Sequence, residues 1–216
     1  MALNLSPLQV YEVDKDIVLR TAEPTDAYKI SQYFITNRSH LKQWEPEREA
    51  EFFTLPGWTQ RLIKLSDLHR LGLGYYLLII DRHSDQMLGT ISFSNLTRFP
   101  VHACHVGYSL AEQAQGRGVM GRALKMALDY MFTKQNMHRI MASYMPHNQR
   151  SEAVLTRLGF EREGYAKDYL LIDGQWRDHV LTALINSEWR EVARKGPPRP
   201  GCWTCGPAPG CVPDAP

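Results

Sequence analysis

A glycine-rich segment in the second half of the chain has the composition of an anion-binding loop. It reads Gln115-Gly116-Arg117-Gly118-Val119-Met120-Gly121, and a long amphipathic helical pattern follows it. Consecutive backbone N–H groups at the start of a helix attract anions, and glycines let a diphosphate approach the main chain closely. Arg122 and Lys125 add positive charge beside Arg117. The segment is typical of a phosphate-binding loop, and the alternative is a glycine-rich turn before a solvated basic helix.

The same glycines also spell G-x-G-x-x-G, the pattern of dinucleotide-binding folds. That fold needs an acidic residue about 20 positions further on to bind the ribose. No Asp or Glu lies between Asp129 and Glu152, and Asp129 belongs to the helical pattern itself. No Gly-Lys-Ser/Thr follows either, which excludes a P-loop. We therefore expect neither NAD nor a P-loop nucleotide at this site.

The apolar periodicity places this loop between a strand and a helix. Strands are predicted at residues 17–22, 75–80, 87–96, 101–110 and 138–144, and helices at 24–34, 58–71, 118–135 and 151–158, with a hairpin turn at Asp173-Gly174. The predicted fold class is α/β (α+β), with a mixed, mostly antiparallel sheet. Because one crossover helix joins the strand that ends near Leu110 to the strand that starts near His138, these two strands should be parallel.

Length and composition are typical of one cytosolic domain. The chain has 216 residues, 44% of them hydrophobic, and a net charge of +2. No apolar run approaches the roughly 20 residues of a membrane span, no signal-peptide pattern opens the chain, and the small charge does not favour bulk nucleic-acid binding. Cys104 is the only cysteine before residue 195. We predict a domain at 1–194 and a disordered Pro/Gly-rich tail at 195–216, in which Cys202 and Cys205 lack the second pair of a structural zinc site.

Several motifs resemble those of the GCN5-related N-acetyltransferase (GNAT) superfamily. Gln115-x-x-Gly118 is similar to the start of its Q/R-x-x-G-x-G/A signature, with Met120 in the sixth position and Gly121 one place later. Asn148-Gln-Arg-Ser151, followed by Leu158-Gly159-Phe160, resembles its closing motif. The segments His40-Leu-Lys-Gln-Trp44-Glu45-Pro, 138–148 and 164–184 resemble the ribosomal-protein-alanine N-acetyltransferases of the RimJ group within it.

This resemblance implies the acyl-CoA N-acyltransferase fold, with a sheet splayed at the acetyl-CoA site. It implies transfer of acetyl from acetyl-CoA to the N-terminal alanine amine of a small-subunit ribosomal protein, met alone or in a pre-ribosomal particle. Two alternatives stay open: acetylation of another peptide or small amine, and a non-catalytic ribosome-assembly module that retains CoA. No membrane or sequence-specific nucleic-acid partner is expected. The implied CoA-binding residues are Tyr108, Ser109, Leu110, Gln115, Gly116, Arg117, Gly118, Val119, Met120, Gly121, Arg122, Asn148 and Ser151.

The resemblance leaves the proton-transfer residues open. An α-amino group has a pKa of about 7.7–8.0 against about 10.4 for lysine, so a weak base suffices. Glu45 is one candidate base and, with Trp44, a candidate acceptor contact; otherwise it is a solvated charge. His102 is the second candidate base, or a partly buried structural histidine. His102, Cys104 and His105 predict no metal site, because residues 102 and 105 would point to opposite strand faces.

Two polar residues of the closing motif also have two interpretations each. Ser151 resembles the serine that protonates the departing thiolate in Rim-type enzymes, but a serine at this place also serves as a helix N-cap. Asn148 would hydrogen-bond the pantetheine arm, or it is a turn residue before the helix.

Overall fold

The computed structural model describes residues 9–191, so the predicted tail at 195–216 lies outside the described residues and the 1–194 domain boundary stays a prediction. The strands are β1 Tyr11–Asp14, β2 Ile17–Thr21, β3 Tyr75–Asp81, β4 Met87–Thr97, β5 Ala103–Leu110, β6 Arg139–Tyr144, β7 Glu161–Ile172 and β8 Gln175–Ile185. The α-helices are α1 Ala27–Thr36, α2 Arg38–Leu41, α3 Leu55–Arg70, α4 Val119–Thr133 and α5 Gln149–Arg157. Short 3-10 turns are η1 Pro24–Asp26, η2 Lys42–Trp44, η3 Ala50–Phe53 and η4 Glu112–Ala114.

One mixed sheet organises the described part of the chain. Its strand order is β1-β2-β3-β4-β5-β6-β8-β7, and every neighbouring pair is antiparallel except β5 and β6. The predicted mixed, mostly antiparallel sheet and its single parallel pair are therefore confirmed. The pair is parallel because α4 carries the chain from one end of β5 back to the start of β6.

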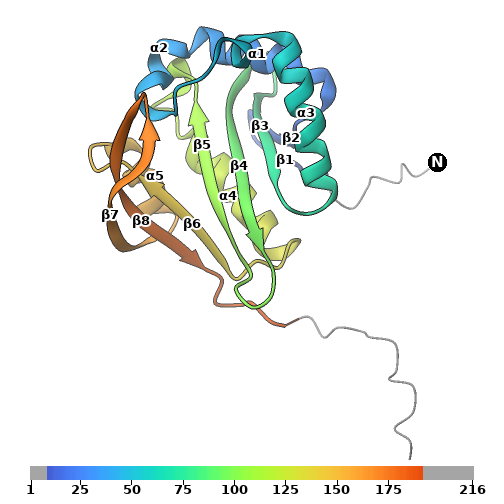
Figure 1. Ribbon diagram of the computed structural model, residues 1–216. Helices are drawn as coiled ribbons and strands as arrows, with labels where there is room; N and C mark the ends of the chain where they lie inside the picture. Colours follow the sequence, from blue (N-terminus) through green and yellow to red (C-terminus); the bar gives the residue numbers. More distant parts are fainter. Residues whose placement is uncertain (1–8, 192–216) are drawn as a thin grey trace, which may run out of the picture.

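Helices cover both faces of this sheet (Figure 1). The helices α1 and α3 pack together on one face, where they contact β4 and β3, whereas α4 covers the other face with α5 beside it. The buried side of α4 carries the apolar residues Val119, Ala123, Leu124, Ala127, Leu128 and Met131 at helical spacing. No helix among residues 9–191 has the length and apolar character needed to cross a membrane.

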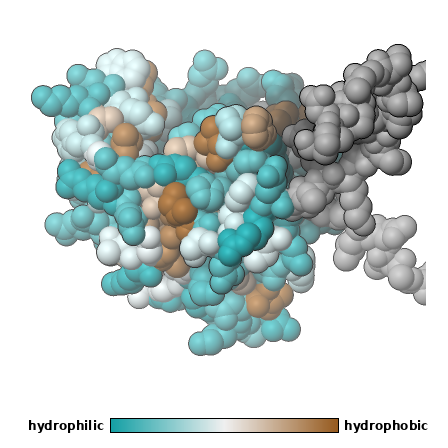
Figure 2. Space-filling model, turned by 90° about the horizontal axis from the view of Figure 1, so that it is seen from below, coloured by the Kyte–Doolittle hydropathy of each residue, from teal (hydrophilic) through white to brown (hydrophobic). Residues whose placement is uncertain are grey.

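The hydrophilic surface is interrupted by small apolar groups. Figure 2 views the molecule from below Figure 1 and shows these groups scattered among polar residues, not joined into one apolar face. Phe99 and Val101, in the turn between β4 and β5, are exposed apolar residues of this kind. Single apolar residues are normal on a protein surface and do not by themselves mark a binding face.

Several element boundaries differ from the sequence prediction, and one strand was not predicted. The helix predicted from residue 58 begins at Leu55, because the Thr54 hydroxyl caps it by accepting a hydrogen bond from the Gly57 N–H at 3.1 Å. The strand predicted from residue 101 begins at Ala103, because His102 has a positive φ of 48° and donates its N–H to the Arg98 carbonyl. The strand β1 was not predicted, since its four residues are too few to show an alternating pattern.

The β7–β8 hairpin turns at Asp173-Gly174, as predicted. Both residues have positive φ, 45° and 71°, which the tight hairpin turn requires. The turn packs against the segment after α2, where the Asp173 N–H donates to the Glu45 carbonyl at 3.1 Å. A distant part of the chain thereby supports the segment that carries Trp44 and Glu45.

Candidate active site

The two parallel strands separate before they reach the glycine-rich loop. Pairing between β5 and β6 is limited to Ala103–Arg139, Cys104–Ile140 and His105–Met141. Beyond it, β5 continues to Leu110 paired only with β4, while β6 continues to Tyr144 paired with β8. The sheet is therefore open along one side of the last part of β5.

Two backbone N–H groups of β5 face this opening. The Ala111 N–H donates to the Leu88 carbonyl, and hydrogen-bonded pairs alternate along an antiparallel ladder. The Ser109 N–H therefore points to β4, whereas the N–H groups of Tyr108 and Leu110 point into the opening. Tyr108, Ser109 and Leu110 are all implied CoA-binding residues. Of their three N–H groups, those of Tyr108 and Leu110 are available to bind the thioester and the pantetheine arm, whereas that of Ser109 is not.

The glycine loop leads from β5 to the first turn of α4. Gly116 and Gly118 have positive φ of 72° and 69°, and Gly118 is the residue that precedes the helix. A Cβ atom added at either glycine, or at Gly121, would meet no atom within 4 Å. The space over the loop is therefore open to a ligand, and the amides of the first α4 turn have no helical partner. This arrangement fits the diphosphate of a coenzyme A molecule.

Part of the positive charge near the loop is already neutralised. Arg122 lies 2.7 Å from a carboxylate oxygen of Asp16 and 3.6 Å from one of Asp14, both in the β1–β2 hairpin. Its hydrogen bond and charge hold the pKa of Asp16 below its ordinary value. Arg117, half exposed, approaches Asp16 only to 3.8 Å. Arg117 is therefore the freer cation at the loop, and Arg122 also anchors the start of α4 to the β1–β2 hairpin.

Gln115 connects the loop to two other parts of the chain. Its Nε2 lies 2.8 Å from His40 Nε2 of α2, and its Oε1 accepts a hydrogen bond from Arg150 of α5 at 2.6 Å. Val119 and Met120 are buried in the core directly behind the loop. The loop is thus held by side chains on one side and by packing on the other, which limits the rearrangement needed to bind a ligand.

The structure shows which of Ser151 and Asn148 caps the helix α5. The helix cap is Asn148, whose Oδ1 accepts a hydrogen bond from the Ser151 N–H at 3.1 Å. The N-cap interpretation of Ser151 is therefore wrong, and the hydroxyl of Ser151 lies instead 2.7 Å from the Tyr108 hydroxyl. Burial raises the pKa of Tyr108 to about 12, so this phenol stays protonated. The pair places a hydroxyl beside the opening between β5 and β6.

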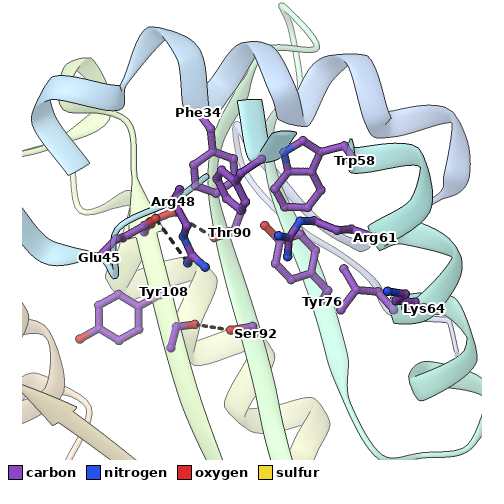
Figure 3. A pocket seen from close by; sticks show the side chains of 14 residues that line it. Phe34, Glu45, Arg48, Trp58, Arg61, Lys64, Tyr76, Thr90, Ser92 and Tyr108 are labelled. Carbon is purple, nitrogen blue, oxygen red and sulfur yellow. Dashed lines mark hydrogen bonds and ion pairs between the residues drawn. The ribbon is translucent and has the colours of Figure 1, made fainter. Parts of the chain in front are cut away.

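A cavity of about 400 Å³ lies on the α1–α3 face, where it reaches the end of β5 (Figure 3). Tyr108 and Ser109 form one end of it. The other lining residues are Phe34, Glu45, Arg48, Phe52, Trp58, Arg61, Lys64, Leu65, Tyr76, Thr90, Ser92 and Gly107. A second cavity of about 210 Å³ shares Phe34, Glu45, Arg48 and Phe52 with it. The opening between the strands thus adjoins a space large enough for part of an acceptor molecule.

Glu45 lies between these two cavities. Burial raises the pKa of its carboxyl, although Arg48, whose guanidinium lies 3.6 Å away, opposes that shift. A carboxylate whose pKa is raised toward neutrality is a better proton acceptor than an exposed one. Trp44, next to it, packs with its ring 5.4 Å from the ring of His147. Glu45 thus lines both cavities, whereas Trp44 lines neither of them and contacts His147, next to Asn148 of the closing motif.

His102, a predicted base, is placed away from the opening. It precedes β5, and its ring packs 5.0 Å from that of Trp189. Six residues of extended chain, roughly 20 Å, separate it from Tyr108. His102 is therefore too far from the opening to accept a proton there, and its alternative, a partly buried structural histidine, fits its surroundings. No group of three or more His, Cys, Asp or Glu among residues 9–191 is arranged to hold a metal ion.

Sequence reasoning missed the polar residues that line the cavity from other elements. Ser109 Oγ lies 2.9 Å from the Tyr33 hydroxyl and 3.0 Å from Thr90 Oγ1, which links α1, β4 and β5 at the cavity wall. Arg48, Arg61 and Lys64 were likewise not singled out. No motif marks Tyr33, Thr90 and the three cations, because they come from three separate elements and a loop.

Comparison with known proteins agrees with this geometry. Residues 16–161 match the family model described as an acetyltransferase (GNAT) domain. Over 173 residues the chain is 48% identical to the [Ribosomal protein uS5]-alanine N-acetyltransferase of Escherichia coli K12, which covers 80% of this chain and 89% of that protein. It is also 30% identical over 174 residues to a probable N-acetyltransferase, YjcK, of Bacillus subtilis, with 81% and 96% covered.

Two solved structures have the same fold and detectable sequence identity. The ribosomal-protein-S5-alanine acetyltransferase of Vibrio fischeri aligns with a TM-score of 0.83 and 48% identity, covering 84% of this chain and all of that one. RimJ of Mycobacterium smegmatis, solved in complex with CoA-disulfide, aligns with a TM-score of 0.75 and 31% identity, covering 81% and 84%.

Proposed function

The chain belongs to the acetyltransferase (GNAT) family, and on this basis we propose that it transfers acetyl from acetyl-CoA to the N-terminal alanine amine of a small-subunit ribosomal protein. The observation that supports transfer best is the opening between β5 and β6. The anion-binding loop lies at one end of this opening and the 400 Å³ cavity at the other. Tyr108 borders both the opening and the cavity. The ribosomal acceptor is proposed from the 48% identity to the uS5-alanine enzyme.

The residues of this chain would bind and orient acetyl-CoA in an extended arrangement. The amides of Gly116 to Gly121 and the Arg117 side chain hold the diphosphate at the start of α4. The N–H groups of Tyr108 and Leu110 face the pantetheine arm and the thioester. When bound, acetyl-CoA supplies a thioester carbonyl whose oxygen gains negative charge during attack. Prepositioned N–H donors stabilise that charge.

Direct attack by the acceptor amine needs no covalent enzyme intermediate. Cys104 is the only free cysteine among the described residues; it is fully buried, and burial raises the pKa of its thiol to about 12. A buried, protonated thiol is a poor nucleophile. The amine forms the new C–N bond, the C–S bond breaks, and CoA leaves as the thiolate. Glu45, directly or through water, accepts the proton of the amine, and Ser151 donates one to the thiolate.

The acceptor assignment is tested by intact-mass spectrometry of ribosomal proteins from cells with and without the gene. The expected result is one small-subunit protein that is lighter by one acetyl group in the deletion strain. Purified enzyme should also acetylate a peptide that begins with alanine much faster than a polyamine. Unchanged masses throughout would remove the ribosomal assignment, and faster turnover of the polyamine would favour a small-amine acceptor.

A binding module that merely retains CoA is distinguished by the Glu45→Gln/Ser151→Ala double variant, which lacks both proton-transfer groups. If this variant loses acetyl transfer yet restores every cellular effect of the deletion, catalysis is not the protein's role. We expect the opposite, namely loss of both together. The acceptor and the reaction are proposed to be cytoplasmic, where ribosomal proteins are made.

A further inference from the structure

The acceptor cavity carries an excess of positive charge. Arg48, Arg61 and Lys64 line it, and Glu45 is its only acidic lining residue (Figure 3). Glu45 is paired with Arg48. Neither Arg61 nor Lys64 lies within 4 Å of a carboxylate among residues 9–191. Two cations in the cavity are therefore left without an acidic partner.

The two arginines are held in place by the aromatic wall of the cavity. The Arg48 and Arg61 guanidinium carbons lie 4.6 Å and 5.0 Å from the centre of the Phe52 ring, a cation–π geometry. Arg61 and Lys64 are three residues apart on α3 and so share one face of the helix. The Nε of Arg48 is buried without a hydrogen-bond partner. A buried donor without a partner costs free energy, which a bound acceptor group would recover.

Such a cavity is poorly matched to an acceptor that is purely cationic. Positive charges lower the proton affinity of a nearby amine, which favours the neutral nucleophile that the reaction needs. They also repel an acceptor that brings only positive charge. A peptide with a carboxylate shortly after its N-terminus avoids this repulsion, because its amine reaches the thioester while its acidic side chain meets the cations.

We propose that Arg61 and Lys64, together with Arg48, form a subsite for an acidic side chain among the three residues that follow the acetylated N-terminus. The proposal deepens the proposed function and rests on it. The extended acceptor chain advances about 3.3 Å per residue, so three residues span roughly 10 Å from the reacting amine. The subsite would select among alanine-starting proteins, a choice that the N-terminal alanine alone cannot make.

The test compares alanine-starting peptides that carry Glu at position two, three or four with matched peptides that carry Gln there. At one of these positions the wild-type enzyme should prefer Glu by about tenfold in kcat/KM, the size expected of a charge-assisted hydrogen bond. The variants Arg61→Gln and Lys64→Gln should lose most of this preference, so that their kcat/KM values on the Glu and Gln peptides become nearly equal. Arg70→Gln, on the same helix but outside the cavity, should keep the preference.

A charge-reversal arm and a cofactor arm complete the experiment. Lys64→Glu should favour a Lys peptide over the Glu peptide at the same position. The affinity for acetyl-CoA, measured by calorimetry, should be unchanged in all of these variants. If acetyl-CoA binding weakens instead, the cations serve the phosphates of the cofactor and the proposal is wrong. Equal rates on Glu and Gln peptides would also overturn it, whereas no peptide turnover at all would instead overturn the proposed function.

Discussion

At the scale of single residues, the surroundings of Ser151 decide what its hydroxyl can do. Asn148 caps α5, so the Ser151 hydroxyl is not needed for the helix and contacts Tyr108 instead. A serine that itself caps a helix accepts a hydrogen bond from a backbone N–H, and its hydroxyl oxygen is then engaged by the helix. The hydroxyl is thus left available for proton transfer.

Replacement of Ser151 by Ala should lower kcat by about tenfold, with little loss of stability. The effect is modest because a thiol with a pKa near 8.5 is already a fair leaving group. Asn148→Ala is the matched comparison, since it should lower the free energy of unfolding by about 1 kcal/mol through loss of the cap. Steady-state kinetics and urea unfolding measure the two effects. If Ser151→Ala unfolds as easily as Asn148→Ala and keeps its kcat, the serine has only a structural role.

Glu45 should appear in the pH dependence of the reaction. Burial raises the pKa of its carboxyl, and only the deprotonated form accepts a proton, so activity is lost as the pH falls through that raised value. The acceptor amine also loses activity below its own pKa of about 7.7–8.0. The plot of log kcat/KM against pH should therefore have a slope of about one below that pKa, and about two once Glu45 is also protonated.

The Glu45→Gln variant should keep the slope near one throughout and lose about 100-fold in rate at the optimum, at the low end of what a general base contributes. Glu49→Gln, four residues away, exposed and outside both cavities, is the control and should match the wild type. An unchanged rate and profile in Glu45→Gln would remove the carboxylate from the mechanism.

At the scale of elements, the turn between β5 and α4 depends on backbone conformations that favour glycine. Gly118 has a φ of 69°, and its missing Cβ leaves open space above the helix N-terminus. The first amides of α4 have no helical partner, and the conformation of Gly118 keeps the space in front of them clear. Both features are needed for a ligand to reach these amides. The motif is local, which explains why it was readable from the sequence.

The Gly118→Ala variant should weaken acetyl-CoA binding and lower stability by about 1 kcal/mol, the cost of a left-handed conformation in a residue with a Cβ. Gly72, which follows α3 with a φ of 67°, provides a control for strain alone. Gly72→Ala should lose similar stability but bind acetyl-CoA normally. Calorimetry and thermal unfolding measure both, and equal affinities in the two variants would show that the loop does not contact the cofactor.

At the scale of the whole molecule, the hairpin of β7 and β8 supports the acceptor side of the site. Its turn donates the Asp173 N–H to the Glu45 carbonyl, and Lys42 lies 3.7 Å from the Asp173 carboxylate. More than 100 residues separate these partners in the chain. The position of Glu45 therefore depends on the correct pairing of the last two strands.

Distortion of this turn should affect the acceptor but not the cofactor. Gly174→Ala, at a φ of 71°, should raise the KM for the acceptor peptide severalfold, because the Glu45 segment loses its support. The KM for acetyl-CoA should stay the same, since the loop at α4 lies on the other side of β5. Gly72→Ala again controls for strain. A normal acceptor KM in Gly174→Ala would show that the hairpin does not position Glu45.

Features that depend on local order could be predicted from short stretches of the sequence. The glycine loop before α4, the parallel pairing of β5 with β6 and the Asp173-Gly174 turn follow from periodicity and residue type over short stretches, because backbone sterics and helix or strand patterns act between near neighbours. The resemblance of the motifs then indicated the family. Boundaries were less certain, since capping by Thr54 and Asn148 depends on single hydrogen bonds.

Contacts between side chains that are distant in the chain depend on the folded molecule. In the folded chain His102 lies away from the opening, Arg122 pairs with Asp16, and Ser151 contacts Tyr108. Folding also gathers Arg48, Arg61 and Lys64 around one cavity. Such meetings arise from the packing of helices on a sheet, where residues far apart in the chain become neighbours. The excess of positive charge in the cavity and the raised pKa of Glu45 depend on groups from several elements. They therefore cannot be predicted from any single segment of the sequence.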